Sequence, residues 1–160
     1  DCAAAIDFST LASTNLTDWG PRHDNFAIAQ SGCAVDLSEN TWKAYELERV
    51  YTVTNASRLT FCYAPGPPTC YHHIISPTDT AHTTHGGPLF MVDGRNSQWT
   101  LPIRDYQYSR EFRDAQCFDI PLAQHMAIGD HINRIAFLSS CEEHPTAAGA
   151  TWSKVQIHDA

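Results

Sequence analysis

The chain has 160 residues, of which 42% are apolar and 18% are charged. This composition is typical of one globular domain and excludes a disordered chain. Its net charge of −8 argues against nucleic acid and anionic lipid surfaces as partners, because binding to both depends on clustered Lys and Arg.

Cysteines and sequons indicate where the protein works. Six cysteines are scattered along the chain without the close pairs of a zinc site: Cys2, Cys33, Cys62, Cys70, Cys117 and Cys141. An even number in this arrangement favours disulfide bonds and an extracellular or cell-surface location. Glycosylation sequons begin at Asn15 and Asn55, each in an expected loop or turn. The chain starts at Asp1 without a leader, as expected of a secreted chain after removal of its signal peptide, and it contains no apolar run long enough to span a membrane.

The first quarter of the chain predicts short, extended elements. Residues 1–11 are small and apolar and are expected to form an edge segment, with one helical turn as the alternative. Residues 14–25 contain a Gly-Pro pair and several Asn and Asp residues, so they predict a loop. Residues 26–28 and 33–37 predict short strands on either side of a Ser-Gly pair.

The strongest strand signal lies in residues 40–63. Residues 50–54 are rich in β-branched and aromatic side chains, and residues 59–63 alternate between apolar and polar, as a half-buried strand does. Between these runs, Asn55-Ala56-Ser57 predicts the turn of a short hairpin, because Asn tolerates positive φ.

The rest of the chain predicts further short strands joined by loops. The strand candidates are residues 71–75, 89–92, 98–103, 117–122, 132–138 and 152–158. Three prolines in residues 64–68 predict a tight connection, and residues 76–88 predict a polar loop. Many short strands without a long helical period predict a single all-β domain over residues 1–160, as a sandwich or barrel.

Several segments resemble, in the same order, the non-catalytic β-sandwich modules that accompany agarases and other polysaccharide-degrading enzymes. The matching segments are 31–37 (SGCAVDL), 40–43 (NTWK), 51–54 (YTVT), 59–61 (LTF), 97–99 (SQW), 105–106 (DY), 118–121 (FDIP), 135–138 (IAFL) and 152–157 (WSKVQI). The resemblance implies a jelly-roll β-sandwich with an accessory role in binding carbohydrate or in scaffolding. It also implies core positions for Trp42 and Trp152.

Aromatic residues near loops are the candidates for carbohydrate binding. Trp19 and Trp99 lie beside polar residues, where an exposed indole could stack on a sugar ring, and Tyr106 and Tyr108 are similar.

The sequence predicts no cofactor and no complete metal site. In the modules that the chain resembles, the strand matching residues 135–138 runs into aspartates suited to calcium, whereas here it runs into Glu142 and Glu143. Two carboxylates are too few for calcium, which takes 6 to 8 oxygen ligands. His82 and His85 could share an ion within a loop, but no third ligand stands at a suitable spacing, so a polar surface loop is the favoured interpretation.

Catalytic motifs are absent from the sequence. It contains no nucleophile elbow, zinc-protease motif, phosphate loop or dinucleotide fingerprint, so the chain is expected not to be an enzyme. The alternative is a glycoside-active enzyme using a carboxylate pair such as Asp114 and Asp119. Two functions therefore stay open: a secreted carbohydrate-binding module, and a structural subunit of an extracellular filament or cell-surface assembly that self-associates.

Three disulfide bonds are expected from position along the chain. Cys62 and Cys70 flank the proline-rich connection and are expected to be bonded to each other, Cys117 to Cys141, and Cys2 to Cys33. The apolar segment 1–11 is further expected to be an exchangeable edge that contacts another copy of the protein, the alternative being packing on its own sandwich.

Overall fold

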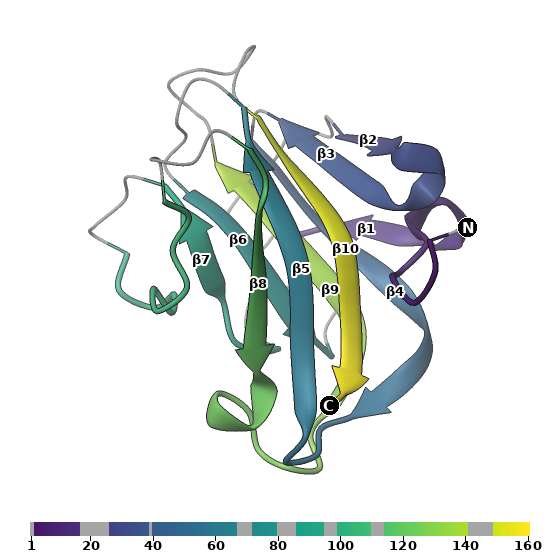
Figure 1. Cartoon of the computed structure of the whole chain (residues 1–160), viewed down its shortest axis with the longest axis vertical. Coiled ribbons are helices and arrows are strands. Elements are labelled where there is room, and N and C mark those ends of the chain that lie inside the picture. The colour runs from purple at the N-terminus through teal and green to yellow at the C-terminus, as the bar shows by residue number, and fades with distance from the viewer. Residues whose placement is uncertain are drawn as a thin grey trace.

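In the computed structural model, the chain forms two five-stranded antiparallel sheets packed face to face (Figure 1). The structure describes residues 2–16, 26–38, 40–66, 72–79, 86–94, 99–109, 114–140 and 149–160. Sheet A has the order β1-β4-β9-β6-β7, with β1 (Ser13–Asn15), β4 (Thr41–Thr52), β9 (His131–Ser140), β6 (His72–Thr78) and β7 (Phe90–Asp93). Sheet B has the order β2-β3-β10-β5-β8, with β2 (Phe26–Ala29), β3 (Ala34–Ser38), β10 (Gly149–Asp159), β5 (Ser57–Pro65) and β8 (Gln116–Pro121).

The order of strands β3 to β10 is that of a jelly roll. The chain passes from one sheet to the other at every connection in this stretch except the one between β6 and β7. Two interlocked Greek keys of this kind place most pairs of consecutive strands in opposite sheets of the sandwich. The predicted fold class, an all-β jelly roll with disulfide bonds, is therefore confirmed. In the described residues, no helix is long and apolar enough to cross a membrane.

The turn at residues 55–56 stands where the sequence predicts it, but it does not close a hairpin. Strand β4 belongs to sheet A and pairs with β9, whereas β5 belongs to sheet B and pairs with β8 and β10. A turn signal fixes only the reversal of the chain, and the strands find their partners far away in the sequence. The hairpin prediction is wrong, and the turn is an arch between the two sheets.

Four other segments differ from their predictions. Strand β1 includes residues 14 and 15, the beginning of the loop predicted at 14–25, because these residues pair with β4. Of the strand predicted at 98–103, residues 99–103 are described and contain no named strand, and an isolated bridge joins Ile103 to Phe90. Strand β6 continues to Thr78, into the loop predicted at residues 76–88. Pro77 lies beyond the residues of β6 that pair with β7, so its missing N–H breaks no hydrogen bond to that strand. The N-terminal segment contains a short 3-10 helix, η1 (Phe8–Thr10), in place of an extended edge.

Two clusters of apolar side chains hold the sandwich together. The main core lies between the sheets, and its largest fully buried side chains include Trp152, Tyr45 and Phe137. A second cluster covers the outer face of sheet A and includes Trp42, Ile74 and Leu138. Trp42 and Trp152 are 3% and 0% exposed, so their predicted core positions are confirmed.

The disulfide bonds follow strand register. Cys2 is bonded to Cys33, as predicted. Cys62 is bonded to Cys117, because the two residues lie directly opposite each other in β5 and β8 with their Cα atoms 3.9 Å apart. The predicted bonds from Cys62 to Cys70 and from Cys117 to Cys141 are therefore wrong. Cys70 and Cys141 lie outside the described residues.

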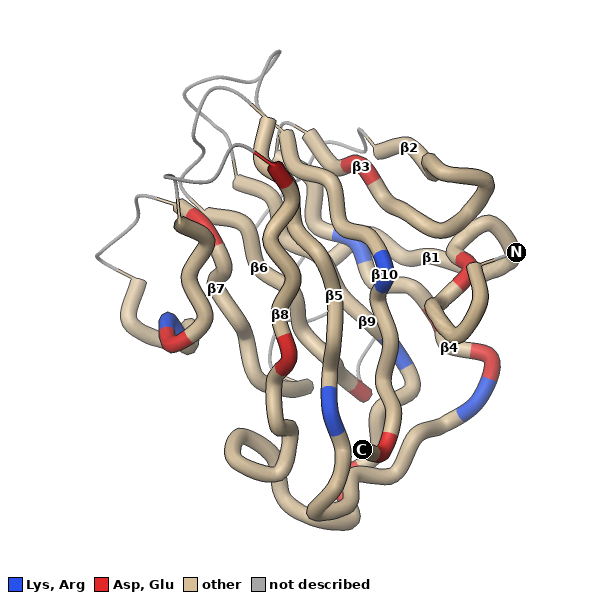
Figure 2. The backbone as a smooth tube through the Cα atoms, in the orientation of Figure 1, with Lys and Arg blue, Asp and Glu red and all other residues tan. Residues whose placement is uncertain are grey.

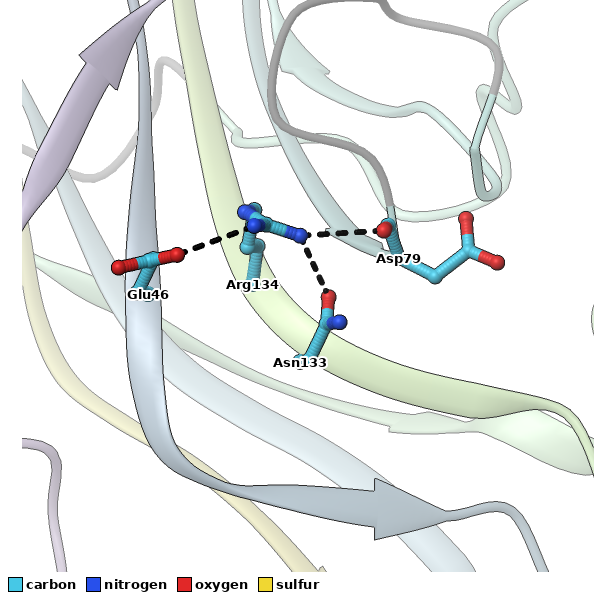
Figure 3. A network of polar contacts seen from close by, with 4 residues as sticks. All are labelled: Glu46, Asp79, Asn133 and Arg134. Atoms are coloured by element: carbon cyan, nitrogen blue, oxygen red, sulfur yellow. Dashed lines mark hydrogen bonds and ion pairs between the residues drawn. The ribbon is translucent and has the colours of Figure 1, made fainter.

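Strand β4 leaves its partner β9 near its middle. Glu46 is opposite Arg134 and Tyr51 is opposite Ile132, so residues 47–50 of β4 face the single residue Asn133 and protrude from the sheet. Figure 3 shows the contacts at the start of this bulge. The Arg134 guanidinium donates to Glu46 Oε1 at 3.0 Å, to the Asp79 carbonyl at 3.1 Å and to Asn133 Oδ1 at 3.0 Å. These bonds fix the point where β4 separates from the sheet.

Candidate functional site

Three rings meet on the outer face of sheet A. Trp99 lies parallel to Trp42, with ring centroids 6.2 Å apart and an interplanar angle of 3°. The His72 ring lies 5.0 Å from Trp99 and 5.9 Å from Trp42. Strands β4 and β6 supply Trp42 and His72, and β9 runs between those strands. We call these three residues the aromatic cluster.

Hydrogen bonds hold the aromatic cluster against the sheet. Trp42 Nε1 donates to Ser140 Oγ on β9 at 2.9 Å, which fixes the plane of its indole. The Arg104 guanidinium donates to the carbonyl oxygens of Trp99 and Pro102. The same segment is tied to β7 through the bond from Met91 N to the Ile103 carbonyl at 2.9 Å. Trp99 is therefore a preoriented ring on a rigid support.

Trp99 is the member of the cluster that reaches solvent. Trp42 is 3% and His72 is 5% exposed, whereas Trp99 is partly exposed and packs on the edge of the second apolar cluster. A partly exposed indole backed by a second indole offers a flat apolar surface without the cost of ordering a mobile side chain.

The structure places the two tyrosine candidates elsewhere. The Tyr106 hydroxyl lies 2.8 Å from His125 Nε2, and its ring packs against Phe90. Burial, with a smaller contribution from the charge of Asp105, raises the pKa of the Tyr106 hydroxyl. Tyr108 is 7% exposed and donates to a backbone carbonyl at 3.1 Å, so it is a core residue that offers no ring to solvent.

Several candidates lie outside the described residues: Trp19, His82, His85, Glu142 and Glu143. Within the described part of the chain, no group of three His, Cys, Asp or Glu side chains could hold a metal ion. Asn55 is exposed at the arch, whereas Asn15 is partly buried in β1, and glycosylation at either residue stays a prediction.

The N-terminal segment is anchored to its own sandwich. Phe8 is 1% exposed and packs edge-on against Tyr45 and Phe137 in the main core. The backbone N–H of Ile6 donates to the Val155 carbonyl of β10 at 2.8 Å, and Cys2 is held by its disulfide bond. Contact of this segment with another copy stays a prediction.

Sequence reasoning missed one part of the site. Trp42 is recognisable from the sequence as a core residue, but nothing in the sequence shows that it supports Trp99, which lies 57 positions later. His72 joins the same cluster because β6 and β4 flank β9, a neighbourhood that only the sheet order creates.

Comparisons with known proteins find solved structures of similar fold. No protein-family model and no curated protein matches the chain. Among solved structures, the chain is similar to TmCBM61 in complex with β-1,4-galactotriose, at 11% identity and a TM-score of 0.48, over 96% of this chain and 91% of that one.

Two further solved structures are similar. One is the family 11 carbohydrate-binding module of a cellulosomal cellulase of Clostridium thermocellum, at 9% identity and a TM-score of 0.43, over 98% of this chain and 94% of that one. The other is the xylan-binding module CBM86 from Roseburia intestinalis, at 9% identity and a TM-score of 0.39, over 92% of this chain and 95% of that one. The jelly-roll assignment rests on the strand order of the chain itself.

Proposed function

We propose that the protein is a secreted, non-catalytic carbohydrate-binding module, and that Trp99 is the residue on which a sugar ring stacks. The observation that carries the proposal is the geometry of the aromatic cluster, in which a partly exposed indole is held parallel to a buried one. The apolar C–H face of a pyranose matches such a surface, because burying it on a rigid ring removes apolar area from water.

Polar groups near Trp99 suit the hydroxyl groups of a sugar. Arg104 is partly exposed next to it, and Thr100 is exposed. A guanidinium and a hydroxyl can donate to sugar oxygens while the ring stacks. The two disulfide bonds among the described residues support the secreted part of the proposal, because such bonds persist in oxidising compartments.

Replacement of Trp99 tests the proposal. We expect Trp99→Ala to weaken binding to a neutral oligosaccharide about tenfold or more, as the loss of a central aromatic anchor does. Isothermal titration against neutral β-linked galactan, glucan and xylan fragments measures the affinity, and circular dichroism of each variant establishes that it is folded. Leu101→Ala is the matched control, because Leu101 is 54% exposed on the same segment.

The outcome separates a binding residue from a structural one. Binding that is retained by Leu101→Ala and lost by a folded Trp99→Ala supports the proposal. Equal affinity in the wild-type protein and Trp99→Ala, or no binding to any neutral fragment, contradicts it.

A further inference from the structure

The sandwich has a second feature on its side, away from the aromatic cluster. A cavity of about 350 Å³ lies between the N-terminal segment, the protruding part of β4 and the last residues of β10. In Figure 1 the N-terminal segment lies beside β4 and β10 on this side of the molecule. We call it the side cavity. Its volume falls within the range of about 300 to 1,000 Å³ that small-molecule sites occupy.

The side cavity exists because two strands lose their outer neighbours. In the described residues, β3 pairs with β10 only as far as Ser153, and β1 pairs with β4 only as far as Tyr45. Beyond these points the N-terminal segment covers the opening between the sheets. The hydrogen bond from Ile6 N to the Val155 carbonyl holds this segment against β10. The protruding residues 47–50 widen the opening further.

Apolar side chains form the floor of the side cavity. Five of its lining residues pack at the partly buried margin of the main core: Ile6, Leu11, Leu47, Tyr51 and Ile157. A ligand seated there would cover apolar surface that the two sheets leave open.

Polar side chains form its rim. Asp7, Glu48, Arg49 and Gln156 also line the cavity. Within the described part of the chain, the side chains of Glu48, Arg49 and Gln156 form no hydrogen bond or ion pair with another residue. Figure 2 shows acidic and basic residues side by side where β4 bends outward. These three side chains can therefore form hydrogen bonds with a ligand without breaking contacts inside the protein, whereas Asp7 already accepts hydrogen bonds from Ser9.

The charge of the rim selects against anions. Two carboxylates and one guanidinium line the cavity, and hydrogen bonds from the Ser9 side chain and then its backbone hold the pKa of Asp7 below its ordinary value. The carboxylate of Asp7 therefore stays charged, and the rim keeps a net negative charge that disfavours phosphates and uronic acids.

Tyr51 is a fixed wall of the side cavity. Its hydroxyl donates to Asp159 Oδ1, and the same oxygen accepts bonds from Thr54 Oγ1 and Ser57 Oγ, each at 3.1 Å. The phenol is therefore anchored at its far end, and its ring needs little further ordering when a ligand packs on it.

We propose that the side cavity binds one residue of a neutral sugar. The C–H groups of the sugar would pack on the apolar floor and Tyr51, while its hydroxyls would bond to Gln156, Arg49 and the rim carboxylates. A purely apolar ligand would leave the rim groups without partners, and an anionic sugar would be repelled. The inference shares with the proposed function the premise that the ligand is a carbohydrate, but its site is separate from Trp99.

The experiment is an amide-resolved NMR titration with matched sugars. The probes are galactose, glucose and mannose, each compared with its own uronic acid, which differs by a carboxylate at the last carbon. The protein is studied as wild type, Gln156→Ala, Trp99→Ala and Gln124→Ala. The last variant is the control, because Gln124 is an exposed glutamine that does not line the side cavity. We expect at least one neutral sugar to shift the amides of residues 47–51 and 156–157 and to bind more tightly than its uronic acid. We expect Gln156→Ala to weaken this binding at least fivefold, and the other two variants to leave it unchanged.

The variants distinguish failure here from failure of the proposed function. Shifts near Trp99 alone, lost in Trp99→Ala, overturn the side cavity as a site and leave the proposed function standing. Shifts in the side cavity that survive in Trp99→Ala, without any response near Trp99, support the side cavity and contradict the role of Trp99. A uronic acid that binds as tightly as its neutral sugar overturns the inference, as does an absence of shifts at residues 47–51 with every sugar. The inference is also overturned if the chemical shifts of these amides change with protein concentration in the absence of sugar, as in self-association, and do not respond to any sugar.

Discussion

Gly32 shows how much a single residue can decide at the base of the N-terminal segment. Its φ is +103°, and a Cβ atom at this position would collide with Asp7 Oδ1. Only glycine provides both the left-handed backbone and the space for this carboxylate, which accepts hydrogen bonds from the backbone and hydroxyl of Ser9.

We predict that Gly32→Ala lowers the free energy of unfolding by more than Gly129→Ala does. Gly129 has a similar φ of +95°, but a methyl group added there would have nothing within 4 Å, so alanine meets backbone strain alone, about 1 to 2 kcal/mol. Gly32→Ala also displaces the Asp7 side chain from its hydrogen bonds with Ser9, and we expect about 1 kcal/mol more. Urea unfolding of both variants measures the difference, and equal losses would contradict the prediction.

The pair formed by Tyr51 and Asp159 predicts a dependence of stability on pH. The Tyr51 hydrogen bond lowers the pKa of Asp159 below 3.8, with further help from Ser57 and Thr54. Burial, and then the Asp159 contact, raises the pKa of Tyr51 above 10.0. A lowered carboxyl pKa gives stability that is lost as pH falls through the folded value, and a raised phenol pKa gives stability that is lost as pH rises from 10.0 toward the folded value.

We expect the stability of the wild-type protein to fall below pH 3.8 and Asp159→Asn to flatten this fall. Tyr51→Phe should flatten the fall above pH 10.0. Urea midpoints across the pH range measure both slopes. Slopes that match the wild-type protein in both variants would show that the pair does not couple to folding.

Among the elements, β5 and β8 are joined by a covalent link as well as by their hydrogen bonds. Cys62 and Cys117 face each other across these two strands and close a loop with a sequence separation of 55. In the chain-entropy treatment a loop of this length stabilises the folded protein by about 4 kcal/mol, and measured values are commonly about 2 to 4.

We predict that Cys62→Ser with Cys117→Ser lowers the free energy of unfolding by about 2 to 4 kcal/mol. Peptide mapping under non-reducing conditions should recover Cys62 joined to Cys117 in the wild-type protein, and Cys2 joined to Cys33 in both proteins. A Cys62 peptide joined to any other cysteine would refute the register of β5 and β8.

For the whole molecule, net charge affects which polymers can approach it. The chain carries −8, so carboxylated and sulfated polysaccharides meet a repulsive field. Salt shortens the range of this field to about 10 Å at 0.1 M.

We therefore predict that the protein binds neutral polysaccharides in preference to anionic ones, and that raising the salt concentration narrows the difference. Affinity electrophoresis in gels containing galactan or pectin, each at low and high salt, measures both effects. An unrelated acidic globular protein of similar size serves as the control for charge repulsion by the gel alone. Tighter binding to the anionic polymer at low salt would contradict the prediction.

The sequence by itself determined the class of fold and most of the strands. Alternation identifies β5 and β10, because a strand with one buried face repeats every two residues, and short β-rich or apolar runs between turn signals identify β2, β3, β7, β8 and β9. The core positions of Trp42 and Trp152, which the resemblance to known modules implies, agree with their burial. Pairing by position along the chain predicts the bond between Cys2 and Cys33 correctly, but the same reasoning gives the wrong partners for Cys62 and Cys117.

Only the tertiary structure decided which distant segments meet. The arch at residues 55–56 looks like a hairpin turn locally, and the partner of Cys62 is set by the register of β5 against β8. The aromatic cluster brings together Trp42, His72 and Trp99, and the side cavity joins three stretches that lie far apart in the sequence. Local propensity acts over a few residues, whereas sheet order and register arise from burying all apolar faces at once, which no single segment encodes.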